Sequence, residues 1–350
     1  MNEEMIQKTR IPHKEAMKYF TRVGLAVLLM FVVREAVAIL AVNIIGAVAP
    51  DFAALVRDGT YWWFNWLLSI IPLYFFGLPA FLLVLPRKPL PVGKKQRLGI
   101  GKLVSVSFST AAGTYILNFV GILILTALQN ISGGLLGGTD SSALNRLLVS
   151  SPMWMIFIVV CIIAPIGEEL IFRKLLIDRL KPFGELNACL FSGLMFGLFH
   201  GNLNQFLYAF AIGFIFATVY VKTNNIIYTM VLHFGVNFFG SIVSLPLSKF
   251  ITENTEWLTE IMKNTSGLTP PELIRALLFG LFCMMLVFLV LGAVVTGIVL
   301  FILYIKKLKF DRPVMLSERD NAEFWKNPGA IMTIVVLSCV ILRALINLPG

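Results

Sequence analysis

Residues 153–173 read MWMIFIVVCIIAPIGEELIFR, an apolar run that is broken near its end by Glu168, Glu169 and Arg173. A run of this length is typical of a membrane-spanning helix. Each ionisable group near the centre of such a helix costs roughly 2.5–3.5 kcal/mol of insertion free energy, so these groups usually face a bundle interior or a wet cavity. Glu169 and Arg173 are four residues apart and can pair on one helix face. Because that pair leaves Glu168 unexplained, the stretch predicts a functional site within the membrane.

The rest of the chain has the composition of a polytopic membrane protein. Of its 350 residues, 58% are hydrophobic and 14% are charged, which is more apolar than a soluble domain. Nine apolar segments can be counted: 23–49, 61–86, 103–129, 153–178, 187–202, 205–221, 225–246, 275–304 and 329–347. Most are long enough to cross a bilayer, whereas the fifth and sixth are short and could be tilted, re-entrant or buried in the bundle. The sequence therefore predicts an all-α transmembrane helix bundle.

The net charge of +10 raises the question of a nucleic-acid partner. The basic residues lie between the apolar segments rather than in one patch, so they indicate topology and no nucleic-acid binding. With the N-terminus in the cytoplasm, 22 Lys and Arg residues fall in inner connections and 5 in outer ones. We therefore expect a cytoplasmic N-terminus and a multi-pass protein of the cell membrane. The general character of the chain favours a bacterial plasma membrane, and the polar stretch 1–22 predicts no cleavable signal peptide.

Two further groups in the N-terminal half carry expectations of their own. Arg34 and Glu35 are neighbours in the first apolar segment, and neighbours point about 100° apart on a helix, so we do not expect them simply to pair with each other. One of them could reach a partner on another helix, which favours a structural role. Trp62, Trp63 and Trp66 fit an aromatic belt at the outer membrane interface.

Two of the three histidines, His200 and His233, lie in apolar segments. The fourth and fifth segments are predicted to form a hairpin that turns near Gly184, with Glu168 sixteen residues before the turn and His200 sixteen residues after it. At 1.5 Å per residue, these two side chains lie at about the same depth.

The sixth and seventh segments turn near Thr223-Asn224, which places His233 and Asn237 roughly 14 and 20 Å above that turn and on one helix face. We therefore expect these two side chains to meet Glu168 and His200 in one layer within the membrane. Close approach of the helices is favoured by small residues repeated every four positions, which are Gly193, Gly197 and Gly201 and then Ala209, Gly213 and Ala217.

This set of groups suits hydrolysis. A carboxylate can take a proton from water as a general base, and a histidine can return it to the leaving amine or hold a metal. A second histidine and an amide can stabilise an oxyanion. Arg173 can hold Glu169 ionised, which acts on Glu168 by like-charge repulsion. No Ser-His-Asp arrangement and no HExxH motif are apparent.

At these residues a family resemblance becomes clear. The chain resembles the CPBP family of intramembrane proteases, also called the CAAX-protease and bacteriocin-processing, or Abi, family. The resemblance covers about 150–245 and rests on three ordered motifs: Glu168-Glu169-x-x-x-Arg173, Phe196-x-x-x-His200 and His233-x-x-x-Asn237.

The resemblance implies an endopeptidase acting on a membrane-embedded or lipid-modified substrate. It implies that Glu168 activates the water with help from His200, that His233 and Asn237 bind the oxyanion, and that Glu169 and Arg173 support Glu168. The family has been described both as metalloproteases and as metal-independent glutamate proteases. Glu168, His200 and His233 could hold zinc, and the same groups could work without it, so zinc and no cofactor both stay open.

Two other functions stay open beside the protease. Intramembrane Glu and His also serve proton-coupled transporters, although the chain lacks an obvious inverted repeat. Some family members are thought to be non-catalytic immunity or scaffold proteins. We divide the chain into a basic cytoplasmic tail (1–22), N-terminal transmembrane segments (23–149), a catalytic core like that of the family (150–245), and an external loop with C-terminal transmembrane segments (246–350). The loop at 250–271 could carry a short surface helix.

Overall fold

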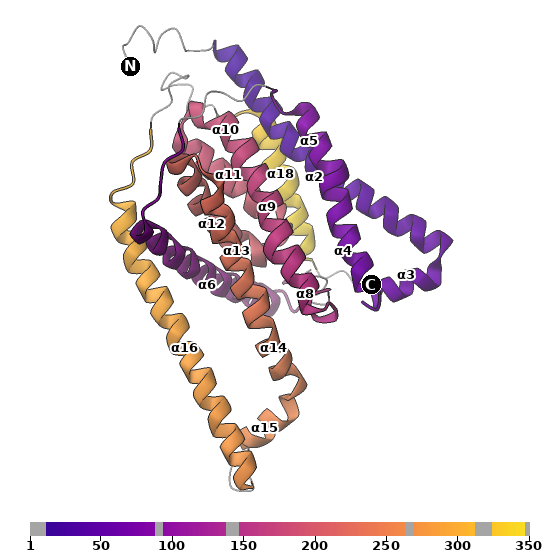
Figure 1. The fold of residues 1–350 in the computed structure, drawn as a ribbon. Coiled ribbons are helices and arrows are strands. Elements are labelled where there is room, and N and C mark those ends of the chain that lie inside the picture. The colour runs from indigo at the N-terminus through magenta and orange to yellow at the C-terminus, as the bar shows by residue number, and fades with distance from the viewer. Residues whose placement is uncertain (1–11, 88–93, 138–146, 264–268, 312–323, 347–350) are drawn as a thin grey trace.

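A computed structural model describes residues 12–87, 94–137, 147–263, 269–311 and 324–346. Over these residues the chain is an all-α bundle (Figure 1), as the sequence predicts. Seven helical stretches are long and apolar enough to cross a membrane, and two shorter apolar helices, α11 (Glu185–Phe199) and α18 (Pro328–Ala344), complete the set of nine predicted segments. The seven are α2 (His13–Val48), α4 to α5 (Trp62–Val84), α6 (Ile100–Ile131), α8 to α10 (Met153–Leu180), α12 (Leu203–Thr223), α13 to α14 (Ile226–Glu253) and α16 (Pro270–Ile305).

The helix pair α11 and α12 forms the centre of the bundle. A Cβ built on Gly193 of α11 would lie 2.8 Å from the backbone nitrogen of Phe214, and one built on Gly213 of α12 would lie 3.1 Å from the Cα of Gly193. The two backbones therefore touch, which confirms the close packing predicted around Gly193 and Gly213, whereas Gly201 lies after the end of α11, has a φ of +71° and faces Val340. The turn before α11 is at Gly184, whose φ is +121°, and the turn after α12 is at Asn224, whose φ is +49°, so both predicted hairpin turns are confirmed.

Two more helix crossings also depend on glycine. Helix α2 crosses α18 where a Cβ on Gly24 would collide with the backbone of Gly329, and Thr333 donates to the Gly24 carbonyl oxygen at 2.8 Å. Helix α16 crosses α6 where a Cβ on Gly297 would collide with the carbonyl oxygen of Phe108. Beyond this crossing, α16 projects from the bundle together with α14 (Ser244–Glu253) and α15 (Thr255–Lys263), as Figure 1 shows. α15 is the short helix expected in the loop at 250–271.

Several transmembrane stretches are interrupted by π-helical turns. These turns are η1 (Pro72–Gly77), η2 (Phe157–Ile163), η3 (Leu170–Leu175) and η5 (Phe238–Val243). Turns η2 and η3 lie on either side of α9 (Ala164–Glu169), which carries the acidic pair. Turn η5 directly follows α13 (Ile226–Asn237), which carries His233. Single π turns inside α-helices occur often at functional sites. The acidic pair and His233 therefore lie on helices directly beside π turns, and Arg173 lies within one.

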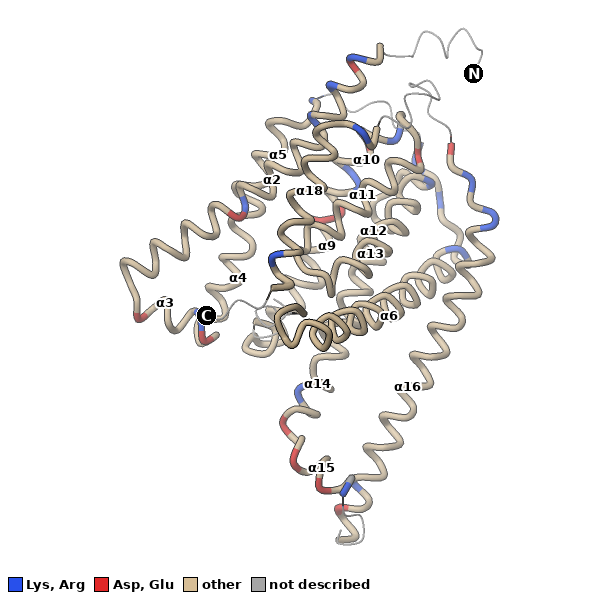
Figure 2. Tube along the Cα trace, turned by 180° about the vertical axis from the view of Figure 1, so that it is seen from behind, with Lys and Arg blue, Asp and Glu red and all other residues tan. Residues whose placement is uncertain are grey.

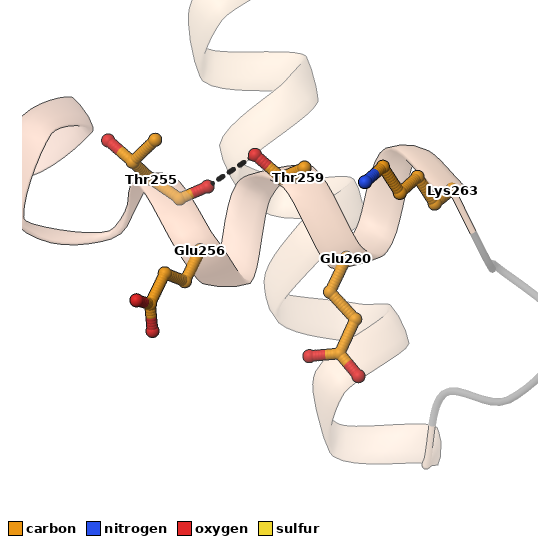
Figure 3. Close-up of a pocket in the computed structure, with 5 residues that line it drawn as sticks. All are labelled: Thr255, Glu256, Thr259, Glu260 and Lys263. Atoms are coloured by element: carbon orange, nitrogen blue, oxygen red, sulfur yellow. Dashed lines mark hydrogen bonds between the residues drawn. The ribbon is translucent and has the colours of Figure 1, made fainter.

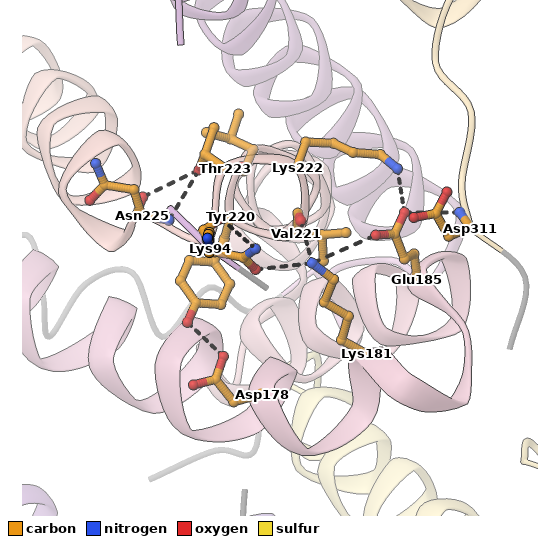
Figure 4. Close-up of polar contacts among 12 residues, drawn as sticks. Lys94, Asp178, Lys181, Glu185, Tyr220, Val221, Lys222, Thr223, Asn225 and Asp311 are labelled. Atoms are coloured by element: carbon orange, nitrogen blue, oxygen red, sulfur yellow. Dashed lines mark hydrogen bonds and ion pairs between the residues drawn. The ribbon is translucent and has the colours of Figure 1, made fainter. Parts of the chain in front are cut away.

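Lys and Arg gather at the end of the bundle near the N-terminus, as Figure 2 shows, which is the end predicted to be cytoplasmic. A polar network joins several elements there (Figure 4). Lys181 donates to the carbonyl oxygen of Val221 at 2.7 Å and to Asn224 Oδ1 at 2.9 Å, and Lys222 pairs with Glu185. Glu185 also accepts from the backbone N–H of Asp311 at 2.9 Å. The network therefore holds the α10–α11 turn (α10, Leu176–Leu180), the end of α12 and the segment after α16 together.

Three expectations on the N-terminal half need correction. Helix α2 begins at His13, ten residues before the predicted segment, and residues 1–11 of the predicted tail lie outside the described part. Arg34 and Glu35 do pair with each other, with Nε 2.7 Å from Glu35 Oε1, because a long arginine side chain can fold back over its neighbour. Trp66 is buried and donates from Nε1 to Ser151 Oγ at 2.9 Å, so it does not lie in an interfacial belt.

Candidate active site

The acidic pair occupies one turn of α9. Glu169 is fully buried, whereas the side chain of Glu168 is 22% exposed. Neighbouring residues point in different directions on a helix, so one glutamate faces the interior of the bundle and the other an accessible edge. Of the two charges in this turn, only that of Glu168 is therefore accessible from outside the bundle.

Arg173 neutralises the buried glutamate. Its Nε lies 3.0 Å from Glu169 Oε2, and both side chains are completely buried, so the i,i+4 pair predicted from the spacing is confirmed. The alignment at Nε is not that of a hydrogen bond, so the attraction is mainly between the two charges. In a low-dielectric interior such attraction is strong, and it offsets a desolvation penalty of several kcal/mol per ion.

Two kinds of contact hold the guanidinium of Arg173 in place. Its Nη1 donates to Ser192 Oγ at 3.2 Å, and Ser192 donates in turn to the carbonyl oxygen of Phe172 at 2.8 Å. The guanidinium carbon also lies 4.8 Å from the ring centroid of Phe196 and 5.8 Å from that of Phe216. Arg173 is thus fixed by α11 and α12 as well as by its own helix.

His233 lies between the two glutamates. Its Nδ1 is 3.0 Å from Glu169 Oε1 and its Nε2 is 3.7 Å from Glu168 Oε2. Because an ionised carboxylate can only accept a hydrogen bond, the imidazole donates from Nδ1 to Glu169 and turns Nε2 toward Glu168. The distance of 3.7 Å exceeds a direct hydrogen bond. Thr229 lies one turn before His233 on α13 and beside Glu169, so it belongs to the same buried group.

His200 terminates α11 and contacts the same aromatic ring as His233. Its Nδ1 is 2.7 Å from the carbonyl oxygen of Phe196, so this nitrogen must carry the proton and the neutral ring keeps a lone pair on Nε2. The Phe196 ring centroid lies 5.0 Å from the imidazole of His200 and 5.6 Å from that of His233. Glu168 is close enough to His200 to act on it electrostatically.

Asn237 is tied to a neighbouring helix. Its Nδ2 donates to the backbone carbonyl oxygen of Val160 in η2 at 2.8 Å, and the backbone carbonyl oxygen of Asn237 accepts from the Ser241 hydroxyl. An amide nitrogen carries two hydrogens, so one N–H of Asn237 is left over for another acceptor.

The structure therefore gathers the predicted residues to different degrees. Glu168, Glu169, Arg173 and His233 contact one another directly, His200 joins them across Phe196, and Asn237 lies one turn after His233 with its amide turned toward η2. Ser192 and Thr229 were not singled out by sequence reasoning. Ser192 lies eight residues before His200 and Thr229 four before His233, so each is a polar residue on the face of a known candidate.

Metal binding at this site would require a set of convergent side-chain ligands. Among the described residues, no group of three His, Cys, Asp or Glu side chains is placed to hold an ion. Nδ1 of His233 faces Glu169 and Nδ1 of His200 faces a backbone carbonyl, which leaves Nε2 of each ring available. A zinc site needs at least three convergent ligands, so we derive no step through a metal.

A shallow depression on the surface of α15 lies outside this site (Figure 3). It is lined by Thr255, Glu256, Thr259, Glu260 and Lys263, all from one nine-residue helix. Thr259 donates to the backbone carbonyl of Thr255 at 2.7 Å, which is an ordinary bond within a helix. The depression contains none of the candidate residues.

Comparison with known proteins points to the same part of the chain. A family model described as "Type II CAAX prenyl endopeptidase Rce1-like" matches residues 150–239. "Putative membrane peptidase YdiL" of Bacillus subtilis (strain 168) is 27% identical over 178 residues, which is 49% of this chain and 68% of that protein. "UPF0177 protein YxdF" of Lactococcus lactis subsp. lactis (strain IL1403) is 32% identical over 149 residues, 42% of this chain and 78% of that protein. No solved structure gives a significant match.

The matched residues 150–239 contain the acidic pair, His200, His233 and Asn237. The relatives are bacterial, and the chain has seven candidate spans, so it is a multi-pass protein of the bacterial cell membrane. From its motifs, its helical architecture and these relatives, the chain belongs to the CPBP family of intramembrane proteases.

Proposed function

We propose that this chain is an intramembrane endopeptidase that hydrolyses a peptide bond of a membrane-embedded or lipid-anchored substrate. One observation carries the proposal: the imidazole of His233 is held by buried Glu169 on one side and faces partly exposed Glu168 on the other. The names of the matching family and of the Bacillus relative, an endopeptidase and a membrane peptidase, support the same reaction class.

Glu168 is the proposed general base. It is the accessible member of the acidic pair, and a carboxylate can take a proton from an attacking water. His200 lies close by with a lone pair on Nε2, so it can accept a hydrogen bond from the same water and orient it. The proton taken by Glu168 then passes to the nitrogen of the leaving amine, which restores the carboxylate when the peptide bond breaks.

His233 is the proposed oxyanion donor. In this scheme Glu169 accepts from Nδ1 of the imidazole and holds it in place, and Nε2–H donates to the oxyanion. A donor directed at the position where negative charge develops stabilises the tetrahedral intermediate. The remaining N–H of Asn237, one turn further along α13, is the second proposed donor. Arg173 keeps Glu169 ionised and is a positioning residue in this scheme.

The proposal is tested with purified protein in detergent. The probe is a library of quenched fluorescent peptides with apolar centres, with and without a farnesyl group on a cysteine, and products are identified by mass spectrometry. We expect wild type to cleave at least one peptide and Glu168→Gln, His200→Ala and His233→Ala to lose about 100- to 10,000-fold in rate, the usual contribution of a general acid or base. His13→Ala, the third histidine, is the matched control and should cleave like wild type. Equal cleavage by all of these proteins would show that the assignment is wrong.

A further inference from the structure

A second ion pair lies in the membrane, and the proposed reaction does not use it. Arg34 and Glu35 lie near the middle of the 36-residue helix α2. Unlike the sealed Glu169–Arg173 pair, they remain open, with side chains 23% and 40% exposed. An accessible arginine at membrane depth is costly, and such residues commonly face a water-filled cavity or a substrate path.

Contacts with aromatic rings place Arg34 beside the active site. Its guanidinium carbon lies 4.9 Å from the ring centroid of Phe31 and 4.6 Å from that of Phe199. Phe199 directly precedes His200, and the charge of Arg34 acts electrostatically on His200. Arg34 therefore lies at the end of α11 that carries the imidazole proposed to orient the water.

The packing of α2 on the stretch α4 to α5 (Trp62–Val84) places Arg34 near the active site by independent contacts. Arg22 Nε donates to the carbonyl oxygen of Val84 at 3.1 Å, and a Cβ on Gly77 would lie 2.9 Å from the carbonyl oxygen of Met30. The two stretches thus run antiparallel, and continuing this register one turn along α2 brings Arg34 level with Tyr74.

Tyr74 in turn reaches the acidic pair. Its hydroxyl packs against Gly167, where a Cβ would collide with it, and it interacts electrostatically with Glu168, the residue that follows Gly167. The packing through Tyr74 therefore places Arg34 at the level of Glu168, and the contact with Phe199 places it at the level of His200.

The hydrogen bonds of the pair determine which ligand it can take. Arg34 donates from Nε and Nη2 to one oxygen of Glu35, and its Nη1 makes no hydrogen bond to any residue that the structure describes. Because Glu35 already neutralises the guanidinium, a second carboxylate would add an uncompensated negative charge near Glu168 in a low-dielectric setting. An uncharged acceptor such as a peptide carbonyl meets no such penalty. A lipid phosphate is out of reach, since at 1.5 Å per residue Arg34 is roughly 17 Å along α2 from Val23, where the apolar segment begins, and roughly 21 Å from its end at Val48.

We propose that Arg34, held by Glu35, donates a hydrogen bond to a backbone carbonyl of the substrate beside the scissile bond. The inference rests on the proposed peptidase function and names a substrate-binding residue for it. Such a contact sets the register of an extended peptide in front of Glu168, so that one particular bond meets the activated water.

The first experiment compares variants on a peptide that wild type cleaves in the library described above. We expect Arg34→Met to lower kcat/KM about 10- to 100-fold, the usual effect of losing a hydrogen bond from a charged donor. Arg343→Met makes the same change on an exposed arginine of α18 and should leave kcat/KM unchanged. Thermal melting of each variant in detergent checks that the comparison is between folded proteins.

The second experiment removes the acceptor from the substrate. Each amide near the scissile bond is replaced in turn by an alkene, which lacks the carbonyl, and as a control by an ester, which keeps the carbonyl and lacks only the N–H. Wild type should show one position where the alkene, but not the ester, lowers kcat/KM about 10- to 100-fold. In Arg34→Met that penalty should disappear. If Arg34→Met does not fold, Arg34→Lys takes its place, and the same penalty should shrink.

Three results would overturn the inference. They are unchanged cleavage by Arg34→Met, an alkene penalty that is equal in wild type and in the Arg34 variant, and a variant effect confined to peptides with a free carboxyl terminus rather than a carboxamide. Loss of the proposed function itself is distinguishable, because Glu168→Gln would then cleave like wild type.

Discussion

The sealed ion pair Glu169–Arg173 allows a quantitative test of the site. Both side chains are completely buried, so replacing Arg173 by methionine leaves a buried carboxylate with only His233 and Thr229 beside it. Breaking a buried pair in this way costs about 3–5 kcal/mol of unfolding free energy. Glu169→Gln strands the guanidinium and should cost a similar amount. The double variant removes both charges, so its cost should fall well below the sum, with a coupling free energy near the upper end of about 0.5–3 kcal/mol.

The assay is unfolding in mixed detergent and dodecyl sulfate micelles, followed by circular dichroism. Lys174 supplies a matched control one residue away, because it also forms an i,i+4 pair, with Asp178 at 2.6 Å, but its side chain is 48% exposed. Lys174→Met should cost less than Arg173→Met, because buried Asp178 keeps the hydrogen bond from the Tyr220 hydroxyl at 2.6 Å. If Arg173→Met costs no more than Lys174→Met, or if the two single changes at Glu169 and Arg173 simply add, the pair is not the buried charge pair described above.

Three more predictions follow from single contacts. Gly297→Ala should destabilise the protein by about 1–3 kcal/mol because the new Cβ meets the carbonyl oxygen of Phe108, whereas Gly292→Ala, with open space around it, should be neutral or stabilising in the same unfolding assay. Ser192→Ala should cost about 1–3 kcal/mol by leaving Nη1 of Arg173 buried without a partner, and an unfolding curve like that of wild type would contradict this. Cleavage should persist in strong chelator, because the described residues offer no three-ligand set; a loss that zinc reverses would show the opposite.

The spans could be predicted because a bilayer imposes a minimum apolar length on every crossing helix. The start of α2 could not, because residues 13–22 are polar and their helix is stabilised by packing rather than by lipid. Phe20 lies 4.7 Å from the ring centroid of Phe183 and 4.9 Å from that of Phe324. Such contacts join parts of the chain that are distant in sequence, so periodicity does not reveal them.

Within the site, residue spacing predicted the depth of each side chain along the bundle better than the direction in which the side chain points. Counting residues from Gly184 and from Asn224 gave the layer in which His200 and His233 meet the acidic pair, because the rise per residue is nearly constant. Which glutamate meets which imidazole depends on rotation about each helix axis. The π turns on both sides of α9 change that rotation. His233 accordingly makes its short contact with Glu169, to which its Nδ1 donates, and not with Glu168.

The same limit explains why Arg34 and Glu35 were expected not to pair. Helical projection gives the direction of a Cβ, but an arginine has several rotatable bonds beyond it, so its guanidinium can return to a neighbouring carboxylate. In the same way, the hydroxyl of Ser192 could be placed on the face of His200 by spacing, whereas its bond to Arg173 required the actual distance between α11 and η3.

Exposure separates the charged and polar groups of this layer into two sets. Glu169 and Arg173 are sealed and contact each other, and His233 links this pair to the accessible side, because its Nδ1 meets Glu169 and its Nε2 faces Glu168. Glu168 and Arg34 are partly exposed, and each retains hydrogen-bonding capacity that the described residues do not use up. A group that is sealed can hold and orient another side chain, but only an accessible group can meet water or a peptide. In the proposed reaction, the sealed pair Glu169–Arg173 therefore supports the site, whereas Glu168 and Arg34 contact water and substrate.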